Sequence, residues 1–354
     1  MEVKTGLVNL PSKGLLKNKK PKLSEKFSKF QSLIKSFPGQ FSQNVFKLSD
    51  FENLRGPFSS VIICGVGGSA ASGDILKGWL NLEKRNHNIK VWRNYDLPYY
   101  ADKTSLFVCV SYSGNTEETL SSFEMARAIG APIVCVSSGG KLEVLSKTYH
   151  IPHVKIPTGI PPRNSVGYLF NSLVKILIQA KMLPDISLKI QKLQKDLKPM
   201  LYEKLAKKIS KKIMTGIPLI YSSAENKFIA HEIKTRLNEN SKIHAFYNYL
   251  PELNHNEMVG FTFPQNHQGA KFFLVLLEDP SDHPRIKICF TAMKNLLKSK
   301  KYSFESLRAS GDNNLEKIFN WINFGDWLSF YVAKSKNIDP INVDLIEDFK
   351  KQLR

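Results

Sequence analysis

Short apolar runs alternate with helical stretches along the first half of the chain, and this rhythm constrains the fold more than any other feature. The runs are rich in β-branched residues and apolar throughout, which is typical of strands buried on both faces of a parallel sheet. The strand candidates are Ser60–Cys64, Ile89–Arg93, Leu106–Val110, Pro132–Ser137 and Ile151–Ile156, and the helix candidates are Ala71–Leu82, Glu117–Ile129, Leu142–Tyr149 and Leu169–Met182. The pattern predicts an α/β fold in which helices cover a mostly parallel sheet.

The second half repeats this rhythm more faintly. Its strand candidates are Ile217–Ser222, Lys242–Tyr247, Phe272–Leu277 and Tyr302–Leu307, and its helix candidates are Phe228–Leu237, Pro284–Leu297, Leu315–Lys334 and Val343–Leu353. Between the halves, residues 186–214 are lysine-rich with leucine and isoleucine at helical spacing, which predicts one connecting helix. We therefore expect two tandem three-layer α/β/α domains, at residues 51–185 and 215–354, after a basic N-terminal segment at residues 1–50.

The composition indicates a soluble protein with a sizeable core. Hydrophobic residues make up 42% of the chain, and no uninterrupted apolar run approaches the ~20 residues that span a bilayer. The N-terminus lacks the layout of a signal peptide. The four cysteines are widely spaced in apolar settings, which predicts buried thiols in a reducing cytoplasm and neither disulfides nor a metal cage; they are Cys64, Cys109, Cys135 and Cys289.

A net charge of +20 raises the question of a nucleic-acid partner. Only nine of the 51 basic residues are arginine, although arginine is favoured for forked contacts with phosphates and bases. A lysine excess spread over many helices is typical of a solvated surface, and charge alone supports only non-specific binding. The densest run, Lys17–Lys29, is either a tail or a helix face. We expect no nucleic-acid partner and no membrane partner.

A glycine-rich loop, Gly65-Val66-Gly67-Gly68-Ser69-Ala70, follows one strand candidate and precedes a helix candidate. Glycines let the backbone turn tightly and present N–H groups to an anion at the helix start. Three interpretations stay open: the fingerprint of an NAD-dependent oxidoreductase, a turn without a ligand, and a loop for a phosphate or sugar. The fingerprint requires an acidic residue at the end of the second strand, whereas Arg93 and Asn94 come before Asp96 here.

A second loop, Ser111-Tyr112-Ser113-Gly114-Asn115-Thr116-Glu117-Glu118-Thr119, also follows an apolar strand and opens a helix. Ser111, Ser113 and Thr116 bring three hydroxyls to free N–H groups at the helix start, a composition that binds phosphate without a metal or a lysine. A helix cap would explain one hydroxyl and not all three. Because the carboxyl ends of parallel strands share one edge of a sheet, the two loops would flank one crevice.

The second loop resembles the phosphosugar-binding loop of sugar isomerase (SIS) domains. Together with Gly67-Gly68-Ser69, Pro161-Pro162-Arg163 and Glu252-Leu253-Asn254-His255-Asn256-Glu257, it makes the chain look like the bifunctional phosphoglucose/phosphomannose isomerase family, from about residue 65 to residue 350. The resemblance implies two tandem SIS domains and an isomerase that interconverts glucose 6-phosphate and mannose 6-phosphate with fructose 6-phosphate. It also implies ring opening, a cis-enediolate, no metal or other cofactor, and a homodimer that lends a histidine across its interface.

The resemblance implies a role for each site residue. The phosphate would be held by Gly67, Gly68, Ser69, Ser111, Ser113 and Thr116. Arg163 would steady the enediolate, as suits a permanently charged planar donor, although an exposed loop arginine is the plainer interpretation. Glu239 would transfer the proton, and His255 and Lys350 would open the sugar ring. Lys351 is the adjacent alternative to Lys350.

The residues alone leave several of these roles open. Glu239 follows a helix candidate and reads as a solvated loop acid that cannot be told from Glu232, Glu252 or Glu257. His255 lies in a polar loop, and its ordinary pKa of ~6.5 lets it exchange a proton at neutral pH. A metal site formed by His255 with Glu252 and Glu257 would lack a second nearby histidine.

Two further sequence features and one rival function remain open. His150 and His153 have metal-ligand spacing, although an edge-strand surface explains them more simply. The segment Asp339-Pro340-Ile341-Asn342 stands where the family often has Asp-Pro-Thr-Pro. The rival to the isomerase, beside the oxidoreductase, is a sensor that binds a phosphosugar without turning it over.

Overall fold

The computed structural model describes residues 22–42, 47–51, 54, 56–267 and 269–353. The first half forms a six-stranded sheet in the order β1-β6-β5-β4-β2-β3. All neighbouring strands are parallel except β1, which pairs antiparallel with β6. The strands are β1 (Lys47–Ser49), β2 (Ser60–Cys64), β3 (Ile89–Trp92), β4 (Ser105–Val110), β5 (Ile133–Ser137) and β6 (His153–Lys155). The expected parallel sheet is confirmed.

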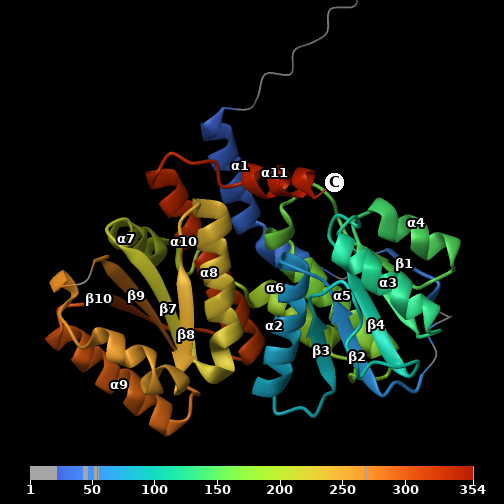
Figure 1. Ribbon diagram of the computed structural model, residues 1–354, viewed down its shortest axis with the longest axis horizontal. Helices are drawn as coiled ribbons and strands as arrows, with labels where there is room; N and C mark the ends of the chain where they lie inside the picture. Colours follow the sequence, from blue (N-terminus) through green and yellow to red (C-terminus); the bar gives the residue numbers. More distant parts are fainter. Residues whose placement is uncertain (1–21, 43–46, 52–53, 55, 268, 354) are drawn as a thin grey trace, which may run out of the picture.

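Helices cover both faces of this sheet (Figure 1). Phe123 of α3 (Glu117–Ala128) and Leu142 of α4 (Gly140–Thr148) pack on Cys64, Cys109 and Cys135, whose thiols are buried and free as predicted. Cys289 is only half-buried. On the other face, α2 (Gly68–Leu82) and α5 (Val166–Gln179) pack on the alternate residues of the strands.

The second half forms a four-stranded parallel sheet in the order β10-β9-β7-β8. Its strands are β7 (Ile217–Ser223), β8 (Phe246–Leu250), β9 (Phe272–Glu278) and β10 (Ser303–Arg308). On one face lies α9 (Pro284–Ser299). The other face is covered by α7 (Glu203–Ile213), α8 (Lys227–Ser241) and α10 (Asn314–Ser335), and α11 (Asp344–Gln352) follows. The three-layer α/β/α arrangement is thus present twice (Figure 1).

Several predicted bounds differ by up to three residues, and two element predictions differ more clearly. Residues 186–214 form two helices, α6 (Ser187–Asp196) and α7, and not one. Pro199 lies in the break, because proline lacks an N–H group and disfavours a helical conformation in the residue before it. Strand β8 begins four residues later than expected, since α8 continues to Ser241 and ends at Lys242 in the left-handed conformation.

An N-terminal helix was not expected as an element. Helix α1 (Leu23–Lys35) takes up part of the densest lysine run and packs on α10 through Phe27 and Phe30, whose rings contact Phe330. The described part of that lysine run is therefore a helix face and not a tail. Residues 17–21 of the run lie outside the described residues.

The inner faces of the two sheets share one hydrophobic core. A single cluster of buried side chains includes Trp79 and Phe170 from the first half together with Ile229, Phe319 and Trp321 from the second. Figure 1 shows α2 and α8 side by side between the sheets. Among the described helices, none is long and apolar enough to cross a membrane.

Candidate active site

The glycine-rich loop connects β2 to α2 and contacts the serine-rich loop. Gly67 caps α2, and a glycine has no side chain with which to satisfy the first N–H groups of the helix. The Oγ atom of Ser69 accepts a hydrogen bond of 3.2 Å from the main-chain N–H of Tyr112, in the second loop. The two loops therefore meet at the carboxyl edge of the first sheet, as the sequence predicts.

The serine-rich loop leads from β4 into α3. The hydroxyls of Ser111 and Thr116 lie 2.8 Å apart, whereas Ser113 is exposed. Thr116 is the cap residue of α3, but its side chain makes no capping hydrogen bond, so the simple helix-cap interpretation is not realised. The amino ends of both α2 and α3 thus lack side-chain caps, which suits them to binding an anion.

The Pro-Pro-Arg turn lies against the glycine-rich loop. It forms a 3₁₀ helix, η4 (Pro162–Asn164), and a side chain at Gly68 would place its Cβ 3.0 Å from the main-chain N and Cα atoms of Arg163. Only glycine lets the two backbones approach this closely. Arg163 is 4% exposed, so the interpretation as an exposed loop arginine is wrong.

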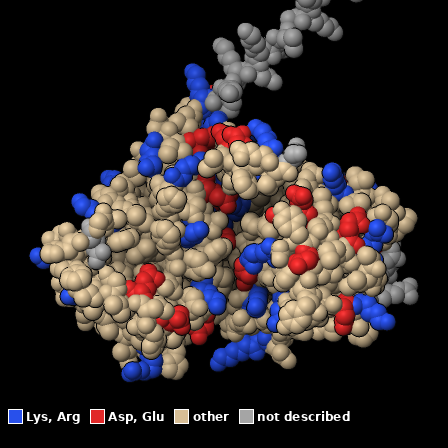
Figure 2. All heavy atoms as spheres, in the orientation of Figure 1, with Lys and Arg blue, Asp and Glu red and all other residues tan. Residues whose placement is uncertain are grey.

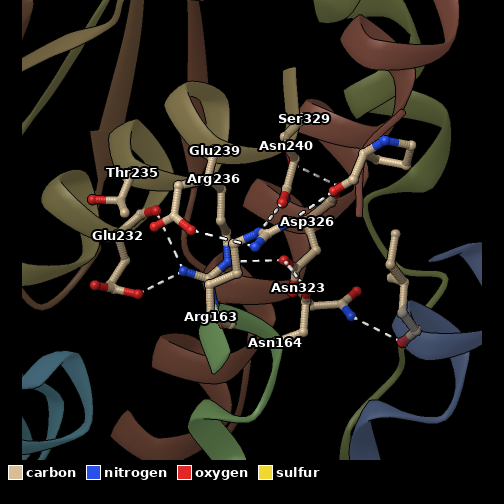
Figure 3. Close-up of polar contacts among 12 residues, drawn as sticks. Arg163, Asn164, Glu232, Thr235, Arg236, Glu239, Asn240, Asn323, Asp326 and Ser329 are labelled. Atoms are coloured by element: carbon tan, nitrogen blue, oxygen red, sulfur yellow. Dashed lines mark hydrogen bonds and ion pairs between the residues drawn. The ribbon is translucent and has the colours of Figure 1, made fainter. Parts of the chain in front are cut away.

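The guanidinium of Arg163 reaches into the second half of the chain (Figure 3). Its Nε donates to Oδ1 of Asn240, its Nη1 to Oε2 of Glu239 at 3.3 Å, and its Nη2 to the carbonyls of Pro340 and Ile341, both at 2.8 Å. These bonds engage four of the five N–H groups, and the fifth, on Nη1, has no partner among the described residues. Burial lowers the pKa of Arg163, but Glu239 opposes this change, and the group stays charged at neutral pH.

Glu239 lies in the last turn of α8, so the prediction of a solvated loop acid is wrong. Its side chain is 24% exposed and its carboxylate lies beside the Arg163 guanidinium, with the two side chains pointing toward each other in Figure 3. A half-buried carboxylate next to a cation is accessible to a small molecule and is held in one orientation. It can act as a proton acceptor.

A buried ionic network under this pair was missed by sequence reasoning. Arg236, 1% exposed, binds Oε2 of Glu232 at 2.6 Å and Oδ1 of Asp326 at 2.9 Å, and also donates to the carbonyl of Arg163. Asn164 donates to the same oxygen of Asp326 (Figure 3). The four-residue spacing of Glu232 and Arg236 was a usable signal, but nothing in the sequence links them to Asp326.

His255 is not brought to Arg163 and Glu239 within one chain. It is exposed at the end of η6 (Glu252–His255), which follows the carboxyl end of β8. Helix α8 starts at this end of the sheet and carries Glu239 at its far end. Since α8 has 15 residues, it spans about 22 Å.

Lys350 and Lys351 are both exposed on α11. They pair with Glu347 at 2.9 Å and with Asp348 at 2.8 Å. The choice between these two lysines therefore stays open.

The structure does not support the two metal hypotheses. Both carboxylate oxygens of Glu257 accept hydrogen bonds, from Tyr221 and Asn248, and Glu252 accepts one from Asn256. No group of three potential metal ligands occurs among the described residues.

His153 is buried in β6, between β5 and β1, so the prediction of an edge-strand surface is wrong for it. Its Nε2 lies 2.9 Å from the hydroxyl of Ser137. His150 is exposed.

The charges visible on the surface are mixed. Figure 2 shows lysine and arginine side chains scattered over this face and interspersed with acidic ones, with a groove between the two halves. A cleft of about 700 Å³ between α2 and α8 carries charges of both signs, including Lys77, Lys227, Asp74 and Glu225. No one-signed stripe of the kind that follows a nucleic-acid backbone is seen on this face.

Comparisons with known proteins point to sugar-phosphate chemistry. Residues 202–353 match the family model of the bacterial phospho-glucose isomerase C-terminal SIS domain. A bifunctional phosphoglucose/phosphomannose isomerase from Caldicellulosiruptor bescii is 35% identical over 303 residues, which cover 83% of this chain and 89% of that protein. A D-glucosamine-6-phosphate 4-epimerase from Sulfolobus acidocaldarius is 33% identical over 221 residues, covering 62% of this chain and 67% of that protein.

Solved structures show the same fold at low sequence identity. The C-terminal domain of glucosamine-fructose-6-phosphate aminotransferase from Francisella tularensis superposes with a TM-score of 0.64 at 15% identity, covering 90% of this chain and 98% of that one. This likeness concerns the SIS fold alone.

Proposed function

Because the chain belongs to the bifunctional phosphoglucose/phosphomannose isomerase family, we propose that it interconverts glucose 6-phosphate and mannose 6-phosphate with fructose 6-phosphate. The observation that carries this proposal is the contact between Glu239 and Arg163, a carboxylate 3.3 Å from a buried cation. Gly68 places Arg163 against the amino end of α2, and Ser69 links that end to the loop before α3; both helix ends lack side-chain caps. An isomerase of this class needs a phosphate site, a base and a cation together, and these residues supply all three.

The substrate phosphate binds to the two loops. Its oxygens accept hydrogen bonds from main-chain N–H groups at the starts of α2 and α3, and from the hydroxyls of Ser69, Ser111, Ser113 and Thr116. The positive ends of the two helix dipoles favour the phosphate charge. Holding the phosphate there fixes the distance from the sugar carbons to Glu239.

Glu239 then moves one proton between C2 and C1. It removes the proton from C2 of the open-chain aldose, the electron pair forms the C1–C2 double bond, and the C1 oxygen becomes the oxyanion of a cis-enediolate. The remaining N–H on Nη1 of Arg163 is placed to bind this oxyanion. The Glu239 carboxyl then protonates C1 and the proton of the C2 hydroxyl passes to the C1 oxygen, so that C2 becomes the carbonyl carbon of the ketose. Because C2 is trigonal in the enediolate, one base serves both glucose and mannose substrates.

Ring opening requires a further acid and base, for which His255 and Lys350 are our candidates. His255 lies near the start of α8, whereas Glu239 lies near its end. His255 therefore reaches the site only from a second copy of the chain. We therefore propose a homodimer, working in the cytoplasm, in which each copy lends His255 to the other. No metal is required by this scheme.

The test is turnover of glucose 6-phosphate and mannose 6-phosphate to fructose 6-phosphate, with a chelator present and no nucleotide added. Glu239→Gln keeps the shape of the side chain and removes the base, so kcat should fall at least ~1,000-fold. The control is Glu124→Gln, at an exposed carboxylate of α3 that pairs with Arg127. Turnover of both sugars that Glu239→Gln abolishes and Glu124→Gln spares supports the proposal.

Other outcomes point to the rivals. Binding of both sugars without turnover would make the chain a phosphosugar sensor, and dependence on NAD would make it an oxidoreductase. Because one relative is a D-glucosamine-6-phosphate 4-epimerase, the assay also includes glucosamine 6-phosphate. Conversion of glucosamine 6-phosphate at C4, with no reaction of glucose 6-phosphate or mannose 6-phosphate, would contradict the isomerase proposal.

A further inference from the structure

The segment between α10 and α11 holds the Arg163 guanidinium through main-chain carbonyls. Both N–H groups of Nη2 donate to this segment, to the carbonyls of Pro340 and Ile341 at 2.8 Å. Residues 336–343 have no helix or strand, so no regular hydrogen-bond ladder fixes these two oxygens. The orientation of the guanidinium therefore depends on whatever holds the segment.

Asp339 holds this segment with both its side chain and its main chain. Its Oδ1 accepts from the N–H of Ile341 at 2.8 Å, its Oδ2 pairs with Nζ of Lys26 at 2.6 Å, and its carbonyl accepts from Nζ of Lys242 at 2.6 Å. Burial alone would raise the pKa of Asp339, but the hydrogen bonds from Lys26 and from the Ile341 amide outweigh it and lower the pKa. The carboxylate is therefore ionised at neutral pH.

Lys26 comes from α1 and is held by the packing of that helix. Phe27 and Phe30 contact the ring of Phe330 with centroid distances of 6.2 Å, and Asn323 donates to the carbonyl of Ile34 at 3.3 Å. Phe330 and Asn323 belong to α10, the helix that leads into the segment. Figure 1 shows α1 lying near α11, at the same end of the molecule. The ion pair thus ties the segment to a firmly seated helix.

We propose that Lys26 and Asp339 are positioning residues for Arg163. The chain of contacts runs from α1 through the Lys26–Asp339 ion pair to the carbonyls that hold Nη2. This inference rests on the proposed function, in which Arg163 stabilises the enediolate. Neither residue touches the two phosphate-binding loops in any contact among the described residues. Loss of the ion pair should therefore weaken stabilisation of the transition state and leave binding of the substrate unchanged.

The experiment compares Lys26→Met, Asp339→Asn and the double variant in steady-state kinetics with fructose 6-phosphate. We expect kcat to fall about ten-fold in each single variant, with KM within about two-fold of wild type, because small displacements of a catalytic group are costly. The kcat of the double variant should be no lower than that of the less active single variant, as expected when the two residues act through one interaction. Lys26→Arg, which keeps the positive charge, should have the kcat of wild type. Lys29→Met, at an exposed lysine one turn along α1, is the matched control.

Three results would overturn the inference: an unchanged kcat in either single variant, a rise in KM with kcat unchanged, or an equal loss in Lys29→Met. A second readout does not depend on activity. The nine arginines give nine Nε–H signals in a ¹⁵N NMR spectrum, and Arg163→Lys identifies the one from Arg163. This signal should shift in Lys26→Met and Asp339→Asn and stay in place in Lys29→Met. If the wild-type protein turns over no sugar, the proposed function fails, whereas an unmoved signal refutes the positioning role.

Discussion

His153 is a buried histidine whose surroundings favour its neutral form. It is 4% exposed, and the Ser137 hydroxyl that it contacts also donates to the carbonyl of Gly139 at 2.9 Å. The Ser137 oxygen therefore accepts from an N–H on Nε2, which assigns the tautomer. Burial lowers the pKa of His153 to about 4. The ordinary pKa of the unfolded state is near ~6.5.

This pKa difference predicts a loss of stability in mild acid. Between about pH 6.5 and pH 4 the unfolded chain binds a proton at His153 that the folded chain does not, so stability falls as the pH falls through this window. The free energy of unfolding should drop by about 2 kcal/mol between pH 7 and pH 5 from this residue alone. His153→Gln keeps an N–H donor and does not titrate. In urea unfolding at pH 7 and pH 5, its free energy of unfolding should fall by about 2 kcal/mol less than that of wild type.

Exposed His244 provides the control for this measurement. His244→Gln should leave the pH dependence of wild type in place. An equal loss in wild type and in His153→Gln would contradict the assignment.

At the scale of residues, the sequence indicates which residues belong to the site better than it indicates what those residues contact. Arg163 is singled out by its Pro-Pro-Arg turn, but its burial depends on Asn240 and Pro340, which are 77 and 177 residues away. Glu239 could not be told from Glu232 by pattern, because both lie on α8 and only the packing decides which one faces Arg163 and which one pairs with Arg236. Distant contacts of this kind leave no local signal.

At the scale of elements, two glycine-containing turns interlock beside the phosphate-binding loop. A Cβ added to Gly114, in the serine-rich loop, would lie 1.8 Å from the carbonyl oxygen of Gly139, at the start of α4. The carbonyl of Gly114 accepts from the N–H of Leu142 at 2.9 Å, and Oδ1 of Asn115 accepts from the N–H of Lys141 at 3.0 Å. The loop is thus held against α4 by its main chain.

Gly114→Ala should therefore damage both folding and substrate binding. Gly130→Ala is a matched control, because Gly130 has a φ of +69° and open space around it, against a φ of +70° at Gly114. The control should cost about 1 kcal/mol of unfolding free energy, the penalty for a side chain in the left-handed region. Gly114→Ala should cost at least about 2 kcal/mol more and weaken fructose 6-phosphate binding by calorimetry at least ten-fold. Equal effects of the two variants would refute the interlock.

The elements themselves were largely predictable, and the errors have local causes. Strands β2, β4 and β5 begin and end within one residue of their predicted bounds, because their apolar runs are bounded by turn residues. The break at Pro199 is readable in the sequence, because proline disfavours a helical conformation in the residue before it. Helix α1 was obscured because it begins inside the densest lysine run, and only Phe30 and Ile34 of its apolar residues are buried.

At the scale of the whole molecule, two predicted domains turn out to share their core. Hydrophobic periodicity shows that a helix has a buried face, but it does not show which sheet that face meets. Helix α8 packs on β7 of its own sheet and also on α2 of the other half, and α10 contacts both α8 and α2. Asn314 of α10 donates to Glu83, just past the end of α2, at 2.9 Å. The site lies where these helices meet, so its geometry could not come from either half alone.

The buried network of Arg236 and Asp326 should therefore stabilise both halves together. Asp326, from α10, is 3% exposed and binds Arg236 of α8 and Asn164 of the Arg163 turn. Burial raises the pKa of Asp326, and the Arg236 guanidinium opposes this rise. Asp326→Asn leaves Arg236 with one carboxylate instead of two, and removing a partner from a buried ion pair costs about 3 kcal/mol.

Urea unfolding should show this loss in one transition for the whole chain, with circular dichroism and tryptophan fluorescence giving the same midpoint. The control is Asp196→Asn, which removes the exposed ion pair with Lys192 on α6 and should change stability by less than about 0.5 kcal/mol. Equal effects of Asp326→Asn and Asp196→Asn would show that the network contributes no more than a surface pair. Separate midpoints for the two probes in wild type would show that the two halves unfold independently. A shared core predicts one midpoint, because α10 packs on α8 of its own half and on α2 of the other half, so that its loss exposes apolar surface in both.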